Sequence, residues 1–114
     1  MKSYTDIEQS RKLAEILPLE SADMFHFLHE VDTVGFGYKK DVEELYSKTK
    51  FEYIPCWSLA ALLGILPKGT NISTHKSINA LCYCCWNRYD EIYADNPIDA
   101  CYTMILKLHE LKML

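Results

Sequence analysis

The chain of 114 residues lacks a basic cluster. It carries 12 Lys and Arg against 16 Asp and Glu, which gives a formal charge of -4 at pH 7. The pair Lys39-Lys40, for example, is followed by Asp41 and two glutamates that cancel its field locally. Because nucleic-acid binding depends on Lys and Arg that neutralise phosphates, this composition argues against a nucleic-acid partner.

Long apolar runs are also missing. The N-terminal segment 1–6 turns polar at once and offers no run of signal-peptide length. The most apolar stretch, 54–66, is broken by Pro55, Ser58 and Gly64. As a helix it would rise only about 20 Å, whereas a bilayer core is about 30 Å thick. We therefore expect a cytoplasmic protein with no membrane partner.

Recognisable catalytic motifs are absent from the sequence. There are only four glycines, and Gly35-Phe36-Gly37 lacks the third glycine and the following helix start of a dinucleotide fingerprint. No glycine-rich phosphate loop, nucleophile elbow or His-x-x-x-His pair occurs. The sequence thus predicts neither an enzyme nor a cofactor.

Five cysteines are present, three of them in the run Cys82-Tyr83-Cys84-Cys85. An odd count without a secretion signal favours reduced thiols packed as small apolar groups. On a strand, Cys82 and Cys84 would point one way and Cys85 the other. A zinc site would need further ligands, which only His26 and His29 are placed to supply, and these two face opposite sides of a strand.

Composition and length indicate one α+β domain over 1–114. The chain is 49% hydrophobic and 25% charged, as is typical of soluble globular domains. At this length it can bury enough surface to fold without metal or disulfides.

Two helices have clear ends. Thr5-Asp6-Ile7-Glu8 predicts a capping box for the first, which Pro18 should stop. Asn96 as N-cap and Pro97 as first residue predict the start of the last. That last helix has a broad apolar arc and should pack on two sides. The arc comprises Ile98, Cys101, Met104, Ile105, Leu108 and Leu111.

The middle of the chain predicts a hairpin and a buried helix. Aromatic-rich runs at 24–28 and 34–38 flank a polar turn and indicate two strands. The segment 39–50 reads as a loop or one to two helical turns. The segment Pro55 to Pro67 is apolar on nearly all sides, which is typical of a central helix.

The segment 72–93 fits two structures. Strands at 72–76, 81–86 and 91–93 would form a hairpin and a third strand, whereas a helical stripe through Ile78, Cys82 and Cys85 would make a helix. Cys, Tyr and Trp favour strands. The complete expectation is a small antiparallel sheet of four to five strands covered by three helices, in the order α-β-β-α-β-β-(β)-α.

Aromatic residues offer a candidate interaction surface. Tyr and Trp combine an apolar body with a polar tip and recur at protein interfaces, although they also fill cores. The candidates are Tyr83, Trp86, Tyr89 and Tyr93.

Three blocks of sequence carry a resemblance: Gln9–Met24, Ile54–Leu63, and Asp95–Leu111 with its Asn-Pro-Ile-Asp-Ala-Cys start. They resemble a family of small uncharacterised proteins from Bacteroides-type gut bacteria and their phages and mobile elements. The resemblance implies an α+β fold and a phage or transposon context, and it brings no activity, cofactor or site residues.

The sequence therefore supports two hypotheses. The first is a small accessory protein that binds another protein, or itself, through aromatic surface. The alternative is a small-molecule or metal-binding domain, or an enzyme, that uses His26, His29 or the Cys82–Cys85 cluster.

Overall fold

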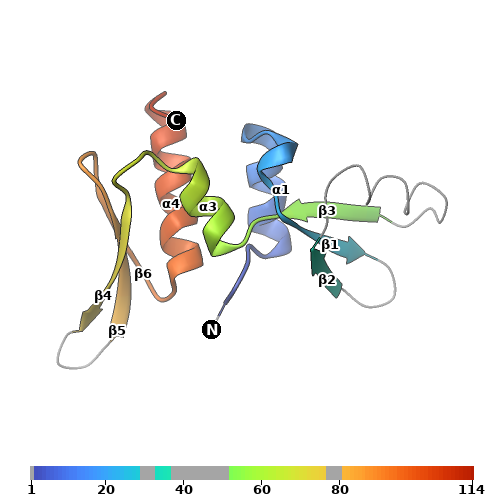
Figure 1. Ribbon diagram of the computed structural model, residues 1–114, viewed down its shortest axis with the longest axis horizontal. Helices are drawn as coiled ribbons and strands as arrows, with labels where there is room; N and C mark the ends of the chain where they lie inside the picture. Colours follow the sequence, from blue (N-terminus) through green and yellow to red (C-terminus); the bar gives the residue numbers. More distant parts are fainter. Residues whose placement is uncertain (1, 29–32, 37–51, 77–80) are drawn as a thin grey trace. The chain divides into compact units, whose positions relative to one another are not determined.

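The computed structural model describes residues 2–28, 33–36, 52–76 and 81–114. Figure 1 shows its helices and strands. In chain order they are α1 (Ile7–Ile16), the 3-10 turn η1 (Leu19–Ser21), β1 (Met24–Leu28), β2 (Thr33–Phe36), β3 (Glu52–Cys56), α3 (Leu59–Ile65), β4 (Asn71–Lys76), β5 (Leu81–Trp86), β6 (Glu91–Ala94) and α4 (Pro97–Glu110).

The described strands form two antiparallel sheets of three strands each, with the orders β2-β1-β3 and β4-β5-β6. They fall in separate compact units. The N-terminal unit comprises Tyr4–Ala61, and the C-terminal unit comprises Leu62–Leu114 with Met1–Ser3. A mixed α+β fold is confirmed, whereas the single sheet of four to five strands is not found among the described residues. The sequence could not show how many sheets share the strands. A single domain over 1–114 stays a prediction.

Helix α1 starts one residue later than expected. Asp6, not Thr5, is its N-cap, and the Asp6 carboxylate accepts from the backbone N–H of Gln9 at 2.8 Å. The Gln9 side chain in turn accepts from the N–H of Asp6, which completes the capping box. Thr5 is instead fully buried, and its hydroxyl accepts a hydrogen bond from the backbone N–H of Trp57. The predicted stop is confirmed, since Leu17 before Pro18 has extended dihedrals.

The N-terminal sheet contains the predicted hairpin. β1 and β2 pair antiparallel with Met24 opposite Phe36. On its other side β1 pairs with β3, which places Phe25 opposite Pro55. Phe25 is fully buried and meets the ring of Tyr53 edge-on, with centroids 5.5 Å apart. The predicted turns within 39–50 lie outside the described residues.

The prediction of a helix beginning at Pro55 is wrong. Pro55 lies in β3, an edge strand, where a residue without an N–H is tolerated. The helix begins only at Leu59, after Ser58, whose hydroxyl accepts from the N–H of Ala61 at 3.3 Å. The Asp23 carboxylate fixes Ser58 by accepting its backbone N–H at 2.9 Å. The apolar run thus combines Cys56, the buried last residue of β3, and the buried Trp57 with a separate helix, in which Leu62 alone is buried rather than the whole helix as expected.

The C-terminal unit confirms the strand interpretation of 72–93. Cys84 of the central strand β5 lies opposite Ser73 of β4 and Tyr93 of β6. Helix α4 lies along one face of this sheet and contacts β5 and β6 (Figure 1). No helix in the described parts of the chain has the length and apolar character needed to cross a bilayer.

Helix α4 begins as the sequence predicts. The Asn96 side chain accepts from the N–H of Asp99 at 2.8 Å, and Pro97 is the first helical residue. The broad apolar arc is buried except at its end, because Leu111 is the C-cap and is exposed. The fully buried members are Ile98, Cys101, Met104, Ile105 and Leu108.

Candidate functional site

The two faces of the β4-β5-β6 sheet differ sharply in character. Side chains alternate along a strand, and residues opposite one another across an antiparallel pair share a face. The face toward α4, here called the inner face, holds Ile72, Tyr83, Cys85 and Ile92. The opposite face, here called the outer face, holds Ser73, His75, Cys84, Trp86, Glu91 and Tyr93.

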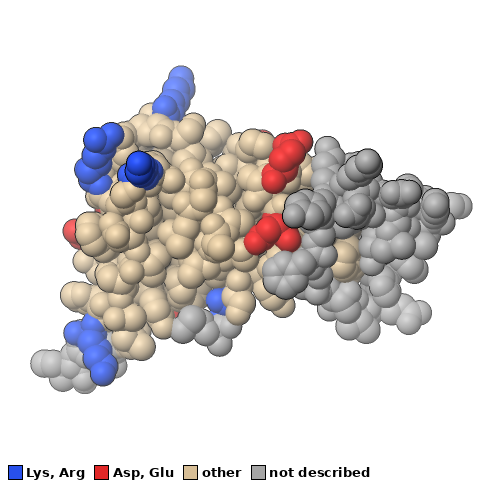
Figure 2. Space-filling model, viewed as in Figure 1, with Lys and Arg blue, Asp and Glu red and all other residues tan. Residues whose placement is uncertain are grey.

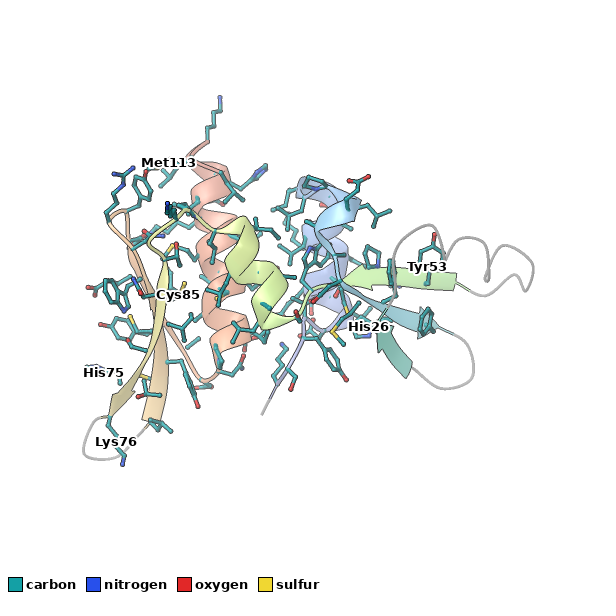
Figure 3. The ribbon with its side chains drawn as sticks, in the orientation of Figure 1. His26, Tyr53, His75, Lys76, Cys85 and Met113 are labelled. Atoms are coloured by element: carbon teal, nitrogen blue, oxygen red, sulfur yellow. The ribbon has the colours of Figure 1, made fainter. Side chains whose placement is uncertain are left out.

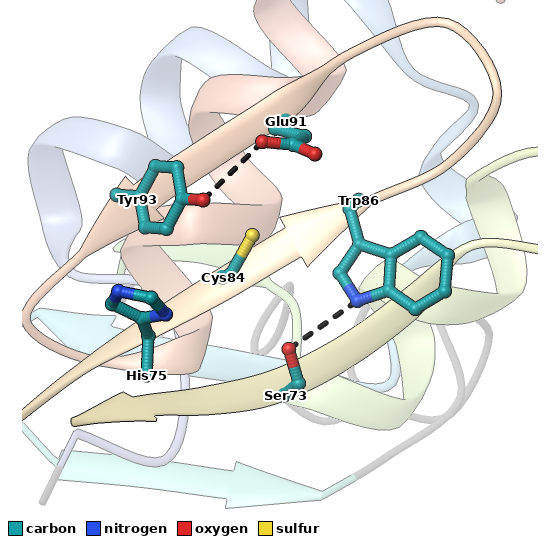
Figure 4. A pocket seen from close by; sticks show the side chains of 6 residues that line it. All are labelled: Ser73, His75, Cys84, Trp86, Glu91 and Tyr93. Carbon is teal, nitrogen blue, oxygen red and sulfur yellow. Dashed lines mark hydrogen bonds between the residues drawn. The ribbon is translucent and has the colours of Figure 1, made fainter.

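A hollow of about 320 Å³ lies on the outer face. These six residues line it, and they come from all three strands (Figure 4), whereas Cys82, which shares the outer face with Cys84, is not part of the lining. Cys84, on the central strand β5, lies between the side chains of Tyr93 and Trp86 (Figure 4). Trp86 is 42% exposed and Tyr93 53% exposed, so both rings reach solvent.

Hydrogen bonds and ring contacts fix the side chains around this hollow. The Trp86 indole N–H of β5 donates to the Ser73 hydroxyl of the adjacent strand β4 at 3.3 Å. The Tyr93 hydroxyl donates to the Glu91 carboxylate at 3.2 Å along β6. The His75 ring meets Tyr93 edge-on, with centroids 5.6 Å apart. The aromatic walls are therefore held in place before any ligand arrives.

The electrostatics of the hollow keep its thiol and phenol protonated. Burial raises the pKa of the Cys84 thiol, a hydrogen bond with Tyr93 opposes it in part, and the negative charge of Glu91 adds a smaller increase. The charge of Glu91 also raises the pKa of Tyr93. Cys84 is thus a poor nucleophile, because the thiolate is the reactive form.

The inner face of β5 is part of the core. Cys85 lies between the sheet and α4 (Figure 3), where the Cys101 thiol donates to its sulfur at 4.0 Å. That hydrogen bond and burial both raise the pKa of Cys101, so the proton stays on this residue. All five cysteines are free thiols. The predicted sidedness is confirmed, with Cys84 lining the hollow and Cys85 packed against α4.

The four predicted interface aromatics do not form one surface. Trp86 and Tyr93 meet at the hollow. Tyr89 is exposed in the turn between β5 and β6, where the guanidinium of Arg88 lies 5.0 Å from its ring centroid. Tyr83 lies on the inner face and is half-buried, so the structure does not bring it together with the others.

The histidines of the alternative hypothesis have different places. His26 is almost fully buried in the N-terminal unit, where its Nε2–H donates to the carbonyl of Thr5 at 2.7 Å. His29 lies outside the described residues. Within 2–28, 33–36, 52–76 and 81–114, no three or more His, Cys, Asp or Glu side chains are grouped to hold a metal ion.

Sequence reasoning missed three residues of the hollow, Ser73, His75 and Glu91. Glu91 begins β6, as the predicted strand 91–93 required, but nothing in the sequence placed its carboxylate beside the two exposed rings. The strand alternation that separated Cys84 from Cys85 would also have grouped these side chains if the register had been known. The register depends on the turns between the strands, which the sequence does not specify.

Comparison of the chain with models of protein families, with curated proteins and with solved structures found no match in any of the three. The resemblance to small Bacteroides-type proteins, and the phage or mobile-element context that it implies, therefore stay predictions.

Proposed function

We propose that this chain is a protein-interaction module that binds a partner protein through the outer face of its C-terminal sheet. The observation that carries the proposal is the exposure of Trp86 and Tyr93, both held by hydrogen bonds beside a hollow. Large aromatic side chains fixed in a solvent-facing position lose little entropy on binding and are enriched among the residues that dominate interface energies.

The charge distribution agrees with a protein partner better than with a polyanion. The hollow is lined by one carboxylate and by no Lys or Arg. On the face in view in Figure 2, basic side chains stand at separate points and most of the described surface is uncharged. Binding to nucleic acid would instead favour a continuous basic stripe.

Selection of random peptides displayed on phage, with the whole chain immobilised, tests the proposal. Selected peptides should bind Trp86→Ala and Tyr93→Ala at least about tenfold more weakly than the unmodified chain, as expected when interface anchors are truncated. Tyr89→Ala is the matched control, because Tyr89 is exposed about as much as Trp86 but lies outside the hollow. Peptides that bind all three variants alike, or a failure to enrich any peptide, would contradict the proposal.

Self-association through the same face is a related outcome. Light scattering after size-exclusion chromatography would then show a dimer of the unmodified chain and a monomer of Trp86→Ala. That result would retain protein–protein contact as the function and make a second copy the partner.

Binding of a small molecule is the second candidate function, and the hollow is the observation that favours it. Its volume lies at the lower end of the range for ligand pockets. Thermal-shift screening of metals and metabolites against the unmodified chain and Cys84→Ser would test it. A ligand-induced shift that the serine variant lacks would support it over the first candidate.

A further inference from the structure

The outer-face hollow combines aromatic walls with a single carboxylate. Trp86 and Glu91 lie opposite one another on β5 and β6, and Cys84 and Tyr93 form the adjacent opposite pair. The Glu91 carboxylate thus lies on the same face as the two electron-rich rings, opposite Trp86 on the neighbouring strand and two residues from Tyr93 on its own strand. The faces of Trp and Tyr attract cations through their quadrupoles, and Trp does so most strongly.

The basic group in the lining of this hollow is the imidazole of His75, which contacts the ring of Tyr93. Lys and Arg are absent from the lining. Two basic residues of the β5–β6 turn and of α4 are paired elsewhere. The Arg88 guanidinium lies 5.0 Å from the Tyr89 ring centroid and donates to its hydroxyl, and Lys107 forms an ion pair with Asp90. The Glu91 carboxylate accepts from the Tyr93 hydroxyl, and a carboxylate has about four acceptor positions in all.

The floor of the hollow is neutral. The Cys84 thiol keeps its proton, so it adds no charge that would compete with Glu91.

The same hairpin already contains one contact of this type. In the turn that joins β5 to β6, the guanidinium of Arg88 lies 5.0 Å from the centroid of Tyr89, within the distance of about 6 Å at which cation–π attraction operates. The hollow offers two rings and a carboxylate, and no Lys or Arg of the described residues lines it.

We infer that the hollow receives a cationic side chain of the partner, the ammonium group of a lysine or the guanidinium of an arginine, between Trp86, Tyr93 and the Glu91 carboxylate. This inference rests on the proposed function and specifies its partner as a basic segment. The net charge of -4 on the chain favours such a partner at long range as well.

Direct titration with side-chain analogues tests the inference without a known partner. The probes are n-butylammonium and n-butylguanidinium chloride, and 1-pentanol is the neutral analogue of similar size, all at constant ionic strength. The readout is the indole N–H signal of Trp86 in two-dimensional NMR spectra. Trp57 is the internal control, since its indole is fully buried in the other unit and donates to Ser21.

The two cations should shift the Trp86 signal saturably and leave the Trp57 signal in place. Glu91→Gln, which retains an acceptor for Tyr93 but removes the charge, should weaken binding about two- to fivefold. Trp86→Phe and Tyr93→Leu should weaken cation binding by a similar factor. In these two variants, binding is measured from the backbone N–H signal of Glu91. Added salt should weaken binding in the unmodified chain more than in Glu91→Gln.

Equal shifts with 1-pentanol, or equal affinity of Glu91→Gln for the cations, would overturn the inference. Peptide selection separates its failure from that of the proposed function. Selected peptides that depend on Trp86 and Tyr93 but contain no enriched Lys or Arg would retain the interaction function and refute the cationic partner. Saturable cation binding without any selected peptide would refute the interaction function instead.

Discussion

The two units stabilise their sheets by different means. In the N-terminal unit, polar groups are buried and bonded to one another: the Thr5 hydroxyl accepts from the backbone N–H of Trp57 at 3.0 Å and shares a bond of 2.8 Å with Ser10. In the C-terminal unit, the buried residues of α4 and of the inner face are apolar or thiols, and polar groups gather on the outer face. Satisfied buried polar groups specify one arrangement, whereas an apolar inner face leaves the other face of the sheet available for binding.

Thr5→Val should give the largest loss of stability among three substitutions that probe this difference. Valine keeps the shape of threonine but leaves the buried N–H of Trp57 without its acceptor, at a cost of about 1–3 kcal/mol. Urea-induced unfolding followed by fluorescence would measure the change. Thr5→Ser, which keeps the hydroxyl, is the control, and a serine variant less stable than the valine variant would show that packing dominates at this position.

Cys101→Ala should have a smaller effect, about 1 kcal/mol, if the thiol acts as a small apolar group. Cys101→Ser should cost more than alanine, because it buries a hydroxyl whose available partner is the weakly accepting sulfur of Cys85. The same unfolding experiment compares them. If the serine variant were as stable as the alanine variant, the interior of the C-terminal unit would tolerate a buried hydroxyl, and the contrast with the N-terminal unit would be wrong.

Asp90→Asn should have the smallest effect, and that effect should depend on pH. The hydrogen bond from Lys107 lowers the pKa of Asp90, so the ion pair stabilises the fold above the ordinary carboxyl pKa of about 3.9. This stabilisation disappears as the pH falls through the lowered pKa of the folded state. The melting temperature of the variant should lie slightly below that of the unmodified chain at pH 7, and the two should converge in strong acid. Glu15→Gln, in the exposed pair with Lys12, should change little at either pH.

Local signals in the sequence were sufficient for most elements of the fold. Pro18, Asn96 and Pro97 act on their immediate neighbours, so the ends that they set could be predicted. The N-cap of α1 was misplaced by one residue because Thr5 and Asp6 are both good caps. The choice between them depends on the burial of Thr5 beside Trp57, 52 positions away in the chain.

The candidate site could be predicted only in part, for the same reason. Tyr and Trp indicated an interaction surface, and alternation separated Cys84 from Cys85. Which aromatic lies beside which carboxylate depends on the pairing of β5 with β6, a nonlocal property. Tyr83 lies three positions from Trp86 in the same strand, so alternation alone places it on the other face of the sheet and could have excluded it from the predicted surface.

The interleaving of core and surface along β5 limits how this chain can change. Adjacent residues of the strand face opposite ways, so the deletion of one residue would turn Trp86 toward α4 and Cys85 toward solvent. A deletion that moved the residues of the hollow would therefore also disrupt the packing of β5 against α4. Evolution or design can exchange side chains at these positions to alter what is recognised, but the spacing along the strand is fixed by the packing behind it.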